Sequence, residues 1–178
     1  MSLYRQVFTT FILLYATSCT GDKKAPDNQN TFFDIGGFFT TEAERLNRKD
    51  QGVLKQVDHN GKIEEQEVKI TDWKKELDLF ISSDINKPSW KNSYAVKKEK
   101  NVTSYTALDT SLKVRKISIE RSGRKISAIE INSRVNNEIY TSSETLKYYP
   151  DSLYSIKKEQ DVRGLGNNTY KINGKIKP

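Results

Sequence analysis

The stretch that most constrains the fold is residues 112–135, which carries the signals of a long β-hairpin. Two arms rich in isoleucine flank the dipeptide Ser122-Gly123, and glycine in a two-residue loop is typical of a tight hairpin turn. With this dipeptide as the loop, Ile119 pairs with Ile126 in the opposite arm. The hairpin predicts an antiparallel sheet but indicates no chemistry.

The apolar side chains of both arms change face part-way along this hairpin. In the first arm the apolar positions are even-numbered up to Val114 and odd-numbered from Ile117, and the second arm changes between residues 128 and 129. Side chains alternate between the two faces of a strand, so either bulges rotate both strands at residues 115–116 and 128–129, or the sheet is covered on opposite faces at its two ends. We expect a strongly coiled sheet in which Ile117 and Ile119 are not both exposed.

After Tyr94 the sequence shows only strand and turn signals, at intervals of roughly ten residues, which is typical of an antiparallel meander. Upstream, the dipeptide Asn60-Gly61 indicates a further hairpin between Gly52 and Ile70. The strands expected after Tyr94 are residues 96–105, 112–121, 124–135, 138–149, 153–160 and 169–176.

Two helices are expected before these strands. Phe39, Ala43 and Leu46 have the spacing of one helical face, and residues 71–81 give the clearest helix, with an apolar stripe that includes Trp73. The predicted fold class is therefore α+β, with two N-terminal helices packed on a curved antiparallel β-meander. The expected domain covers residues 32–178.

The first residues have the composition of a targeting segment. Arg5 supplies one positive charge, an apolar run follows over residues 7–15, and Ala16 and Ser18 place small side chains before Cys19. Cys19 is the single cysteine of the chain, so it has no partner for an internal disulfide.

These residues resemble the start of a bacterial lipoprotein precursor, in which a lipobox ends in a cysteine that is acylated. The resemblance covers residues 1–19 and departs at Ala16, where leucine is usual. It implies a signal peptide over residues 1–18, fatty acyl chains such as palmitate on Cys19, and a flexible tether over residues 19–31. It also implies a Gram-negative cell envelope, with the outer membrane as the first choice. A plain secretory signal followed by a free cysteine is the alternative.

Positive charge is concentrated in one part of the sequence. Residues 91–125 hold ten Lys and Arg against three acids, so this stretch carries the whole net charge of +7. One interpretation is that this stretch binds lipid headgroups, phosphates or acidic glycans. The other is that its Lys and Arg only line solvent-exposed strand faces and keep edge strands from pairing with another chain. Export argues against nucleic acid as a partner. The candidate contacts with an anionic surface are Lys97, Lys98, Lys100, Arg121, Arg124 and Lys125.

An apolar ligand is a second hypothesis. A curved meander over helices is similar in shape to the periplasmic lipoprotein carriers, a likeness of fold alone. A carrier would need an unfilled apolar cavity between sheet and helices, and a surface binder would need an exposed aromatic patch instead. The candidate contacts for a ligand or partner are Trp73, Phe80, Trp90, Tyr94 and Tyr140, with Ile117 as a further cavity residue.

Catalysis is not expected. A Ser-His-Asp arrangement would require His59, the only histidine, and no Gly-x-Ser-x-Gly motif accompanies it. Gly164-Leu-Gly166 lacks the third glycine of a dinucleotide fingerprint, and His59 has no second His or Cys with which to hold a metal. No cofactor is implied.

One short motif points to a modification. Asp151-Ser152-Leu153 resembles the Asp-Ser/Thr-aliphatic acceptor for O-glycosylation in some exported proteins of Gram-negative bacteria, so Ser152 is a candidate acceptor.

Taken together, the sequence predicts a non-catalytic lipoprotein of the cell envelope with a binding or structural role. Its anchor would contact a membrane, and its domain would contact an anionic envelope component or another envelope protein. A carrier of an apolar ligand is the alternative, and an envelope hydrolase the weaker one.

Overall fold

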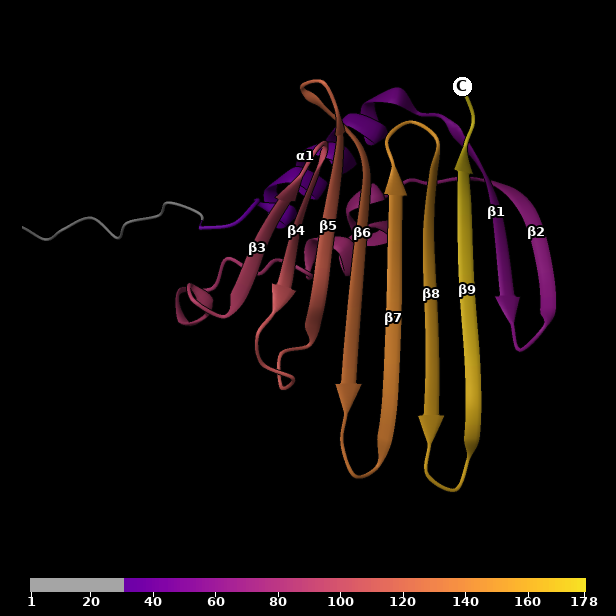
Figure 1. The fold of residues 1–178 in the computed structure, drawn as a ribbon. Helices are drawn as coiled ribbons and strands as arrows, with labels where there is room; N and C mark the ends of the chain where they lie inside the picture. Colours follow the sequence, from indigo (N-terminus) through magenta and orange to yellow (C-terminus); the bar gives the residue numbers. More distant parts are fainter. Residues whose placement is uncertain (1–30) are drawn as a thin grey trace, which may run out of the picture.

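All nine strands that the structure describes belong to one antiparallel sheet (Figure 1). The structure is a computed structural model that describes residues 31–178. Of these residues 54% lie in strands and 18% in helices, so the protein is mostly β and the predicted α+β class is wrong. The hairpin over residues 52–70 contributes two full strands to the sheet, and the second expected helix shrinks to two short turns.

The strands follow one another as a meander with one exception. From β3 to β9 each strand pairs with its neighbour in sequence, whereas β1 pairs with both β2 and the last strand, β9. The order across the sheet is β2-β1-β9-β8-β7-β6-β5-β4-β3. The strands are β1 (Gly52–His59), β2 (Lys62–Lys69), β3 (Tyr94–Glu99), β4 (Val102–Ala107), β5 (Val114–Ser122), β6 (Lys125–Asn136), β7 (Tyr140–Tyr149), β8 (Leu153–Val162) and β9 (Gly166–Ile176).

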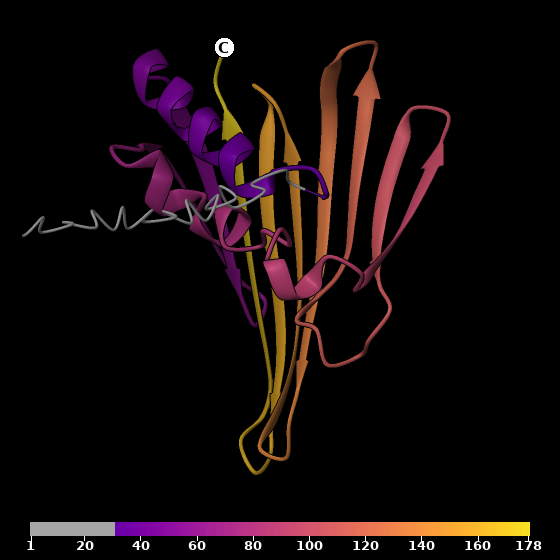
Figure 2. The same ribbon diagram turned by 90° about the vertical axis from the view of Figure 1, so that its left-hand side faces the viewer.

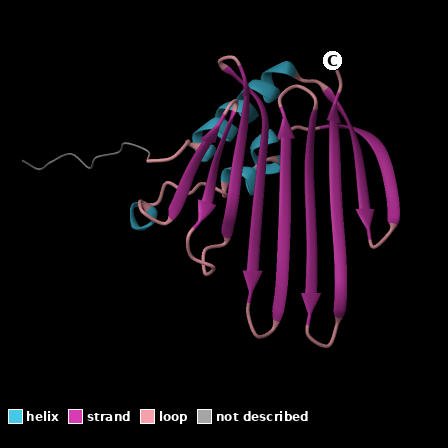
Figure 3. Cartoon of the chain, in the orientation of Figure 1, coloured by secondary structure: helices cyan, strands magenta, loops and turns pink. Residues whose placement is uncertain are grey.

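The described helices lie on one face of the sheet, which we call the inner face (Figures 2 and 3). They are α1 (Ile35–Lys49), α2 (Trp73–Glu76), α3 (Asp78–Ile81) and the 3-10 helix η1 (Pro88–Trp90). The helix expected over residues 71–81 is interrupted at Leu77, where the backbone leaves helical geometry with φ −96° and ψ 12°. No helix among the described residues is both long and apolar enough to cross a membrane.

The core lies between the helices and the inner face. Phe39 of α1 is fully buried, with its ring centroid 4.7 Å from that of Phe80 and 5.1 Å from that of Tyr148 on β7. Burying such aromatic side chains supplies a large part of the hydrophobic stabilisation of a domain of this size. The same face buries Ile117, Ile119, Ile129, Ile131, Leu146, Tyr154 and Ile156.

The long hairpin forms as β5 and β6, with a different register from the expected one. The loop consists of Gly123 and Arg124, one position later than expected, and a register shift lies between Glu120 and Arg121. Together these two differences pair Ile119 with Ile129 instead of Ile126. A second register shift lies between Val114 and Lys116, as one of the two explanations predicted. Bulges therefore account for the change of face, and the expectation that Ile117 and Ile119 are not both exposed is confirmed, since both are fully buried.

The helices cover only part of the inner face. The β6–β7 and β8–β9 hairpins project well beyond α2 and α3, to the bottom of Figure 1. On this projecting part the inner face carries the exposed Lys158 and the partly exposed Gln160 of β8 in place of the apolar residues found higher up. These strands thus place polar side chains on both faces, as strands do that contact water on both sides.

Candidate binding surface

The face of the sheet opposite the helices, which we call the open face, carries no helix of the described residues (Figure 2). On the central strands its side chains are mostly hydroxyls, amides and lysines. This follows from strict alternation: Leu146 and Tyr148 of β7 point inward, so Thr145, Lys147 and Tyr149 point outward.

The register brings these side chains into two neighbouring rows across the strands, here called the polar rows. Adjacent strands lie about 4.8 Å apart, so residues in one row are close neighbours. The first row is Lys147, Ser155, Asn173 and Gln56, and the second row is Asn132, Thr145, Lys157 and Lys171.

Hydrogen bonds hold the neutral side chains of the polar rows in place. The Ser155 hydroxyl donates to Asn173 Oδ1 at 2.8 Å, and Asn173 Nδ2 donates to Gln56 Oε1 at 3.3 Å. In the second row the Thr145 hydroxyl donates to Asn132 Oδ1 at 3.1 Å. Each amide of these chains keeps unused donor and acceptor capacity, because an amide group offers two of each.

The polar rows border a shallow hollow of about 440 Å³ on the open face. Three lysines and no carboxylate line it, and Tyr149, which is 39% exposed, lies at its rim beside Leu153. The complete lining is Thr145, Lys147, Tyr149, Leu153, Ser155, Lys157, Lys171 and Asn173.

The three lysines differ in their partners. Lys157 lies 2.7 Å from Glu159 Oε1 and holds the pKa of that carboxyl below its usual value, while Lys147 lies 3.4 Å from Glu130. Lys171 makes no ion pair among the described residues. It lies directly opposite Lys157, and like charges opposite one another on adjacent strands are unfavourable.

A larger groove of about 890 Å³ lies on the inner face, between α2 and the sheet. Ile156 and Ile172 contribute apolar surface to it, but the polar group of Glu76 in its wall is already bound by two other residues of the protein. Glu76 Oε1 accepts hydrogen bonds from Tyr154 at 2.5 Å and from Lys55 at 2.7 Å. Burial, together with the neighbouring Glu76, raises the pKa of the Tyr154 hydroxyl, which therefore stays protonated. The groove mixes acids and lysines, so it selects no particular charge.

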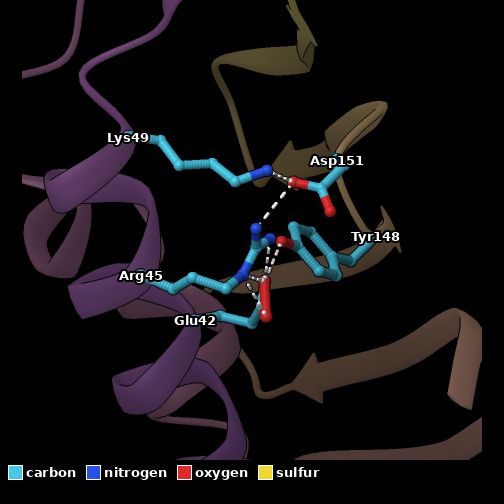
Figure 4. A network of polar contacts seen from close by, with 5 residues as sticks. All are labelled: Glu42, Arg45, Lys49, Tyr148 and Asp151. Atoms are coloured by element: carbon cyan, nitrogen blue, oxygen red, sulfur yellow. Dashed lines mark hydrogen bonds and ion pairs between the residues drawn. The ribbon is translucent and has the colours of Figure 1, made fainter. Parts of the chain in front are cut away.

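A second polar network ties α1 to the turn between β7 and β8 (Figure 4). Glu42 Oε2 accepts from Arg45 at 2.6 Å and from the Tyr148 hydroxyl at 2.8 Å. Asp151 Oδ1 accepts from Arg45 and from Lys49, both at 2.7 Å, and the hydrogen bond from Lys49 lowers the pKa of Asp151. Burial raises the pKa of Tyr148. Every member of this network is paired, so its role is to position the helix.

The aromatic residues predicted to contact a ligand do not form one site. Trp73 and Phe80 are buried in the core, where Trp73 packs 5.9 Å from the ring of Tyr154. The Tyr94 hydroxyl is used internally and donates to the Val114 carbonyl at 3.0 Å.

The two remaining aromatic candidates lie elsewhere. Trp90 lies beneath Lys87, whose Nζ is 4.2 Å from the ring centroid. Tyr140 lines a small polar hollow on the projecting part of β7, and no other aromatic candidate lines that hollow. Ile117 is fully buried as well. The rings of Phe39, Phe80 and Tyr148 fill the interior between α1, α3 and β7, so the open space between helices and sheet is the groove beside α2, which is mixed in charge.

The predicted basic residues gather at one end of the sheet but not on one face. Arg121 donates its backbone N–H to the Asn101 carbonyl at 2.9 Å, so the β3–β4 and β5–β6 turns are neighbours. Lys97 pairs with Glu99 at 2.7 Å, whereas the Arg121 guanidinium lies over the Phe33 ring at 5.6 Å on the inner face. The turns and strand ends also carry Lys98, Lys100, Arg124 and Lys125.

The two candidate modification sites differ in what the structure says of them. Ser152 is exposed in the turn between β7 and β8, and its neighbour Asp151 has a positive φ of 58° and is held by the α1 network. Cys19, the signal peptide and nearly all of the tether lie outside the described residues.

The lysines of the hollow were not among the sequence-based candidates. They are separated in sequence and form no charged run, unlike residues 91–125. The signal that could have found them is the alternation of Lys with Ser, Thr or Asn in the last three strands, combined with the hairpin pairings. Lys147, Lys157 and Lys171 become neighbours only once that register is known.

No metal site accompanies this surface. Within residues 31–178 no three His, Cys, Asp or Glu side chains gather in a way that could hold a metal ion. His59 Nε2 instead lies 2.9 Å from Asn168 Oδ1 at the end of β1. No protein-family model, curated protein or solved structure matches this chain.

Proposed function

We propose that this chain is a non-catalytic lipoprotein of the cell envelope, anchored through an acylated Cys19, that binds a polar ligand on the open face of its sheet. The observation that carries the proposal is the pair of polar rows around the hollow. Their hydroxyls and amides are fixed by mutual hydrogen bonds yet keep free donors and acceptors for a ligand.

Such a surface supports binding because its groups are already oriented. A ligand that meets side chains held in one geometry loses less conformational entropy than one that must order them. A face that served only to solvate the sheet would require no such arrangement, because separately hydrated side chains would do equally well. The partly exposed Tyr149 beside the rows adds the apolar face of its ring and a hydroxyl group that can form a hydrogen bond.

The place where the tether joins the domain is consistent with this use of the open face. Phe32 is buried on the inner face, with its ring 5.6 Å from that of Tyr94 and 5.7 Å from that of Tyr105. A tether over residues 19–31 would therefore join the domain from the helix side. An anchored domain can then hold its helices toward the membrane and its open face toward the envelope.

Two tyrosines provide a matched test of the binding surface. Tyr149 on the open face and Tyr170 on the inner face are both 39% exposed. The full chain in detergent would be applied to an array of envelope polysaccharides as wild type, Tyr149→Ala, Asn173→Ala and Tyr170→Ala. We expect binding that is lost in the two open-face variants and retained in Tyr170→Ala. A wild-type chain that binds nothing, or equal binding by all variants, would overturn the proposal.

The anchor is tested separately by mass spectrometry of the detergent-extracted protein. We expect cleavage before Cys19 and an added lipid mass on that residue. A Cys19→Ala variant that remains in the membrane fraction would refute the anchor while leaving the binding surface untouched.

A further inference from the structure

We infer that the ligand of the open face is an acidic polysaccharide, a sugar polymer with carboxylates along its length. This inference rests on the proposed function and names the ligand class of the same surface. Three features of the hollow lead to it: its charge, its neutral polar groups and its aromatic rim.

The charge of the hollow favours an anion. Lys147, Lys157 and Lys171 line it without any carboxylate among the lining residues. Glu130 and Glu159 approach the first two from outside the hollow.

Lys171 is the lysine of the hollow whose positive charge is least balanced by neighbouring carboxylates. Among the described residues it has no ion pair, and Lys157 lies directly opposite it. Asp58 lies opposite it on the other side, but Oδ1 of that carboxylate accepts from the Gly61 N–H at 2.8 Å. A carboxylate bound between Lys157 and Lys171 would turn an unfavourable like-charge pair into two charge-assisted hydrogen bonds.

The neutral groups of the hollow favour a sugar over a simple anion. Sugar hydroxyls both donate and accept hydrogen bonds, so they need a surface that offers both. Asn173 accepts once from Ser155 and donates once to Gln56, which leaves one N–H and one lone pair for a ligand. Thr145 and Ser155 add two further acceptors beside the lysines.

The rim of the hollow and the extent of the polar rows favour a polymer. Tyr149 presents a partly exposed ring beside the hollow, and an aromatic ring can pack against the apolar C–H face of a sugar. The polar rows extend from β6 to β1, well beyond the hollow itself. A polymer lying across the strands can contact several of these positions at once, which raises affinity without a deep pocket.

A membrane surface fits the open face less well. Membrane-surface binding draws on apolar side chains that enter the lipid as well as on positive charge. Around the hollow, Tyr149 and Leu153 are the only large apolar side chains of the lining, and Phe32, near the start of the described residues, packs on the opposite face of the sheet.

The test compares probes that differ in charge. The full chain in detergent is titrated with polygalacturonate and with dextran of similar length, at low and at high salt. We expect tighter binding to polygalacturonate by about tenfold or more, falling with salt, because exposed charges are screened. Lys171→Gln should weaken polygalacturonate binding by about tenfold, as expected for loss of one charge-assisted contact. Lys74→Gln, at an exposed position of α2 on the inner side of the sheet, is the matched control and should have no effect.

The outcomes separate this inference from the proposed function. Equal binding of dextran and polygalacturonate, unaffected by Lys171→Gln but lost in Tyr149→Ala, would overturn the acidic ligand and keep the binding surface. No binding of either polymer would overturn both. A Cys19→Ala chain that binds phosphatidylglycerol vesicles through Lys171 more tightly than polygalacturonate would overturn the inference in favour of a membrane.

Discussion

The two faces of the sheet are built from the same strands but are organised by different forces. Asn173 and Gly174 are adjacent on β9 and show the contrast. Asn173 takes part in the hydrogen-bonded polar rows of the open face. Gly174 lies beneath the ring of Tyr154 on the inner face, where a Cβ atom would come within 2.1 Å of that ring. Shape determines which residue fits on the inner face, whereas hydrogen-bonding capacity determines it on the open face.

This difference predicts how the two faces respond to substitution. Close packing makes the inner face sensitive to any change of volume. Exposed hydrogen bonds contribute little net stability, because water replaces them when they are lost. Substitutions on the inner face should therefore lower stability, and those on the open face should alter binding with little loss of stability.

The largest effect is expected for Phe39→Ala. Phe39 is fully buried against Phe80 and Tyr148, so the substitution should lower the free energy of unfolding by about 3–5 kcal/mol. Thr145→Ala on the open face is the control and should cost less than about 1 kcal/mol. Urea denaturation of the full chain measures both values. Similar losses in the two variants would show that the faces do not differ in the way described.

A smaller loss of stability is expected for Gly174→Ala, which compares two adjacent residues on opposite faces. The added methyl group would meet the Tyr154 ring, and overpacking of this kind costs about 1–3 kcal/mol. Asn173→Ala, one position away on the opposite face, should cost less than about 1 kcal/mol while reducing ligand binding. Thermal unfolding followed by circular dichroism provides the comparison. A more destabilised Asn173→Ala than Gly174→Ala would reverse the assignment of the two faces.

The smallest effect is expected for Asp151→Asn, at the exposed end of the α1 network. Lys49 and Arg45 hold the pKa of Asp151 below its usual value, so its contribution to stability is complete above about pH 3.9 and is lost as the pH falls through the lowered pKa. The wild type should therefore lose stability more steeply on acidification than the variant. At neutral pH the difference should be about 0.5 kcal/mol, because the pair is solvent-screened. Parallel stability profiles from pH 2 to pH 7 would contradict this role.

The sequence predicted local structure better than the way in which the elements assemble. The Asn60-Gly61 turn is present, with both residues at positive φ of 53° and 85°, because these residue types tolerate that conformation. The strand expected over residues 96–105 is instead two strands with a turn at Lys100, where a basic, polar stretch gives no glycine to mark it.

The order of the strands in the sheet was harder to predict from the sequence, because it depends on pairings between segments that are distant in the chain. The contact of β1 with β9 joins residues more than a hundred positions apart, and no local pattern in either strand encodes it. The same holds for the candidate site. The basic run suggested residues 97–125, whereas the hollow collects single lysines from three strands, and only the register reveals that they are neighbours.

The position of β9 has a consequence for the order in which the chain can fold. β9 lies inside the sheet, between β8 and β1, so the first hairpin has no neighbouring strand until residues 166–176 have been synthesised. Contacts between such distant segments form slowly, since a long loop must close before they stabilise the structure. The chain therefore cannot complete its sheet while β9 is still emerging from the ribosome.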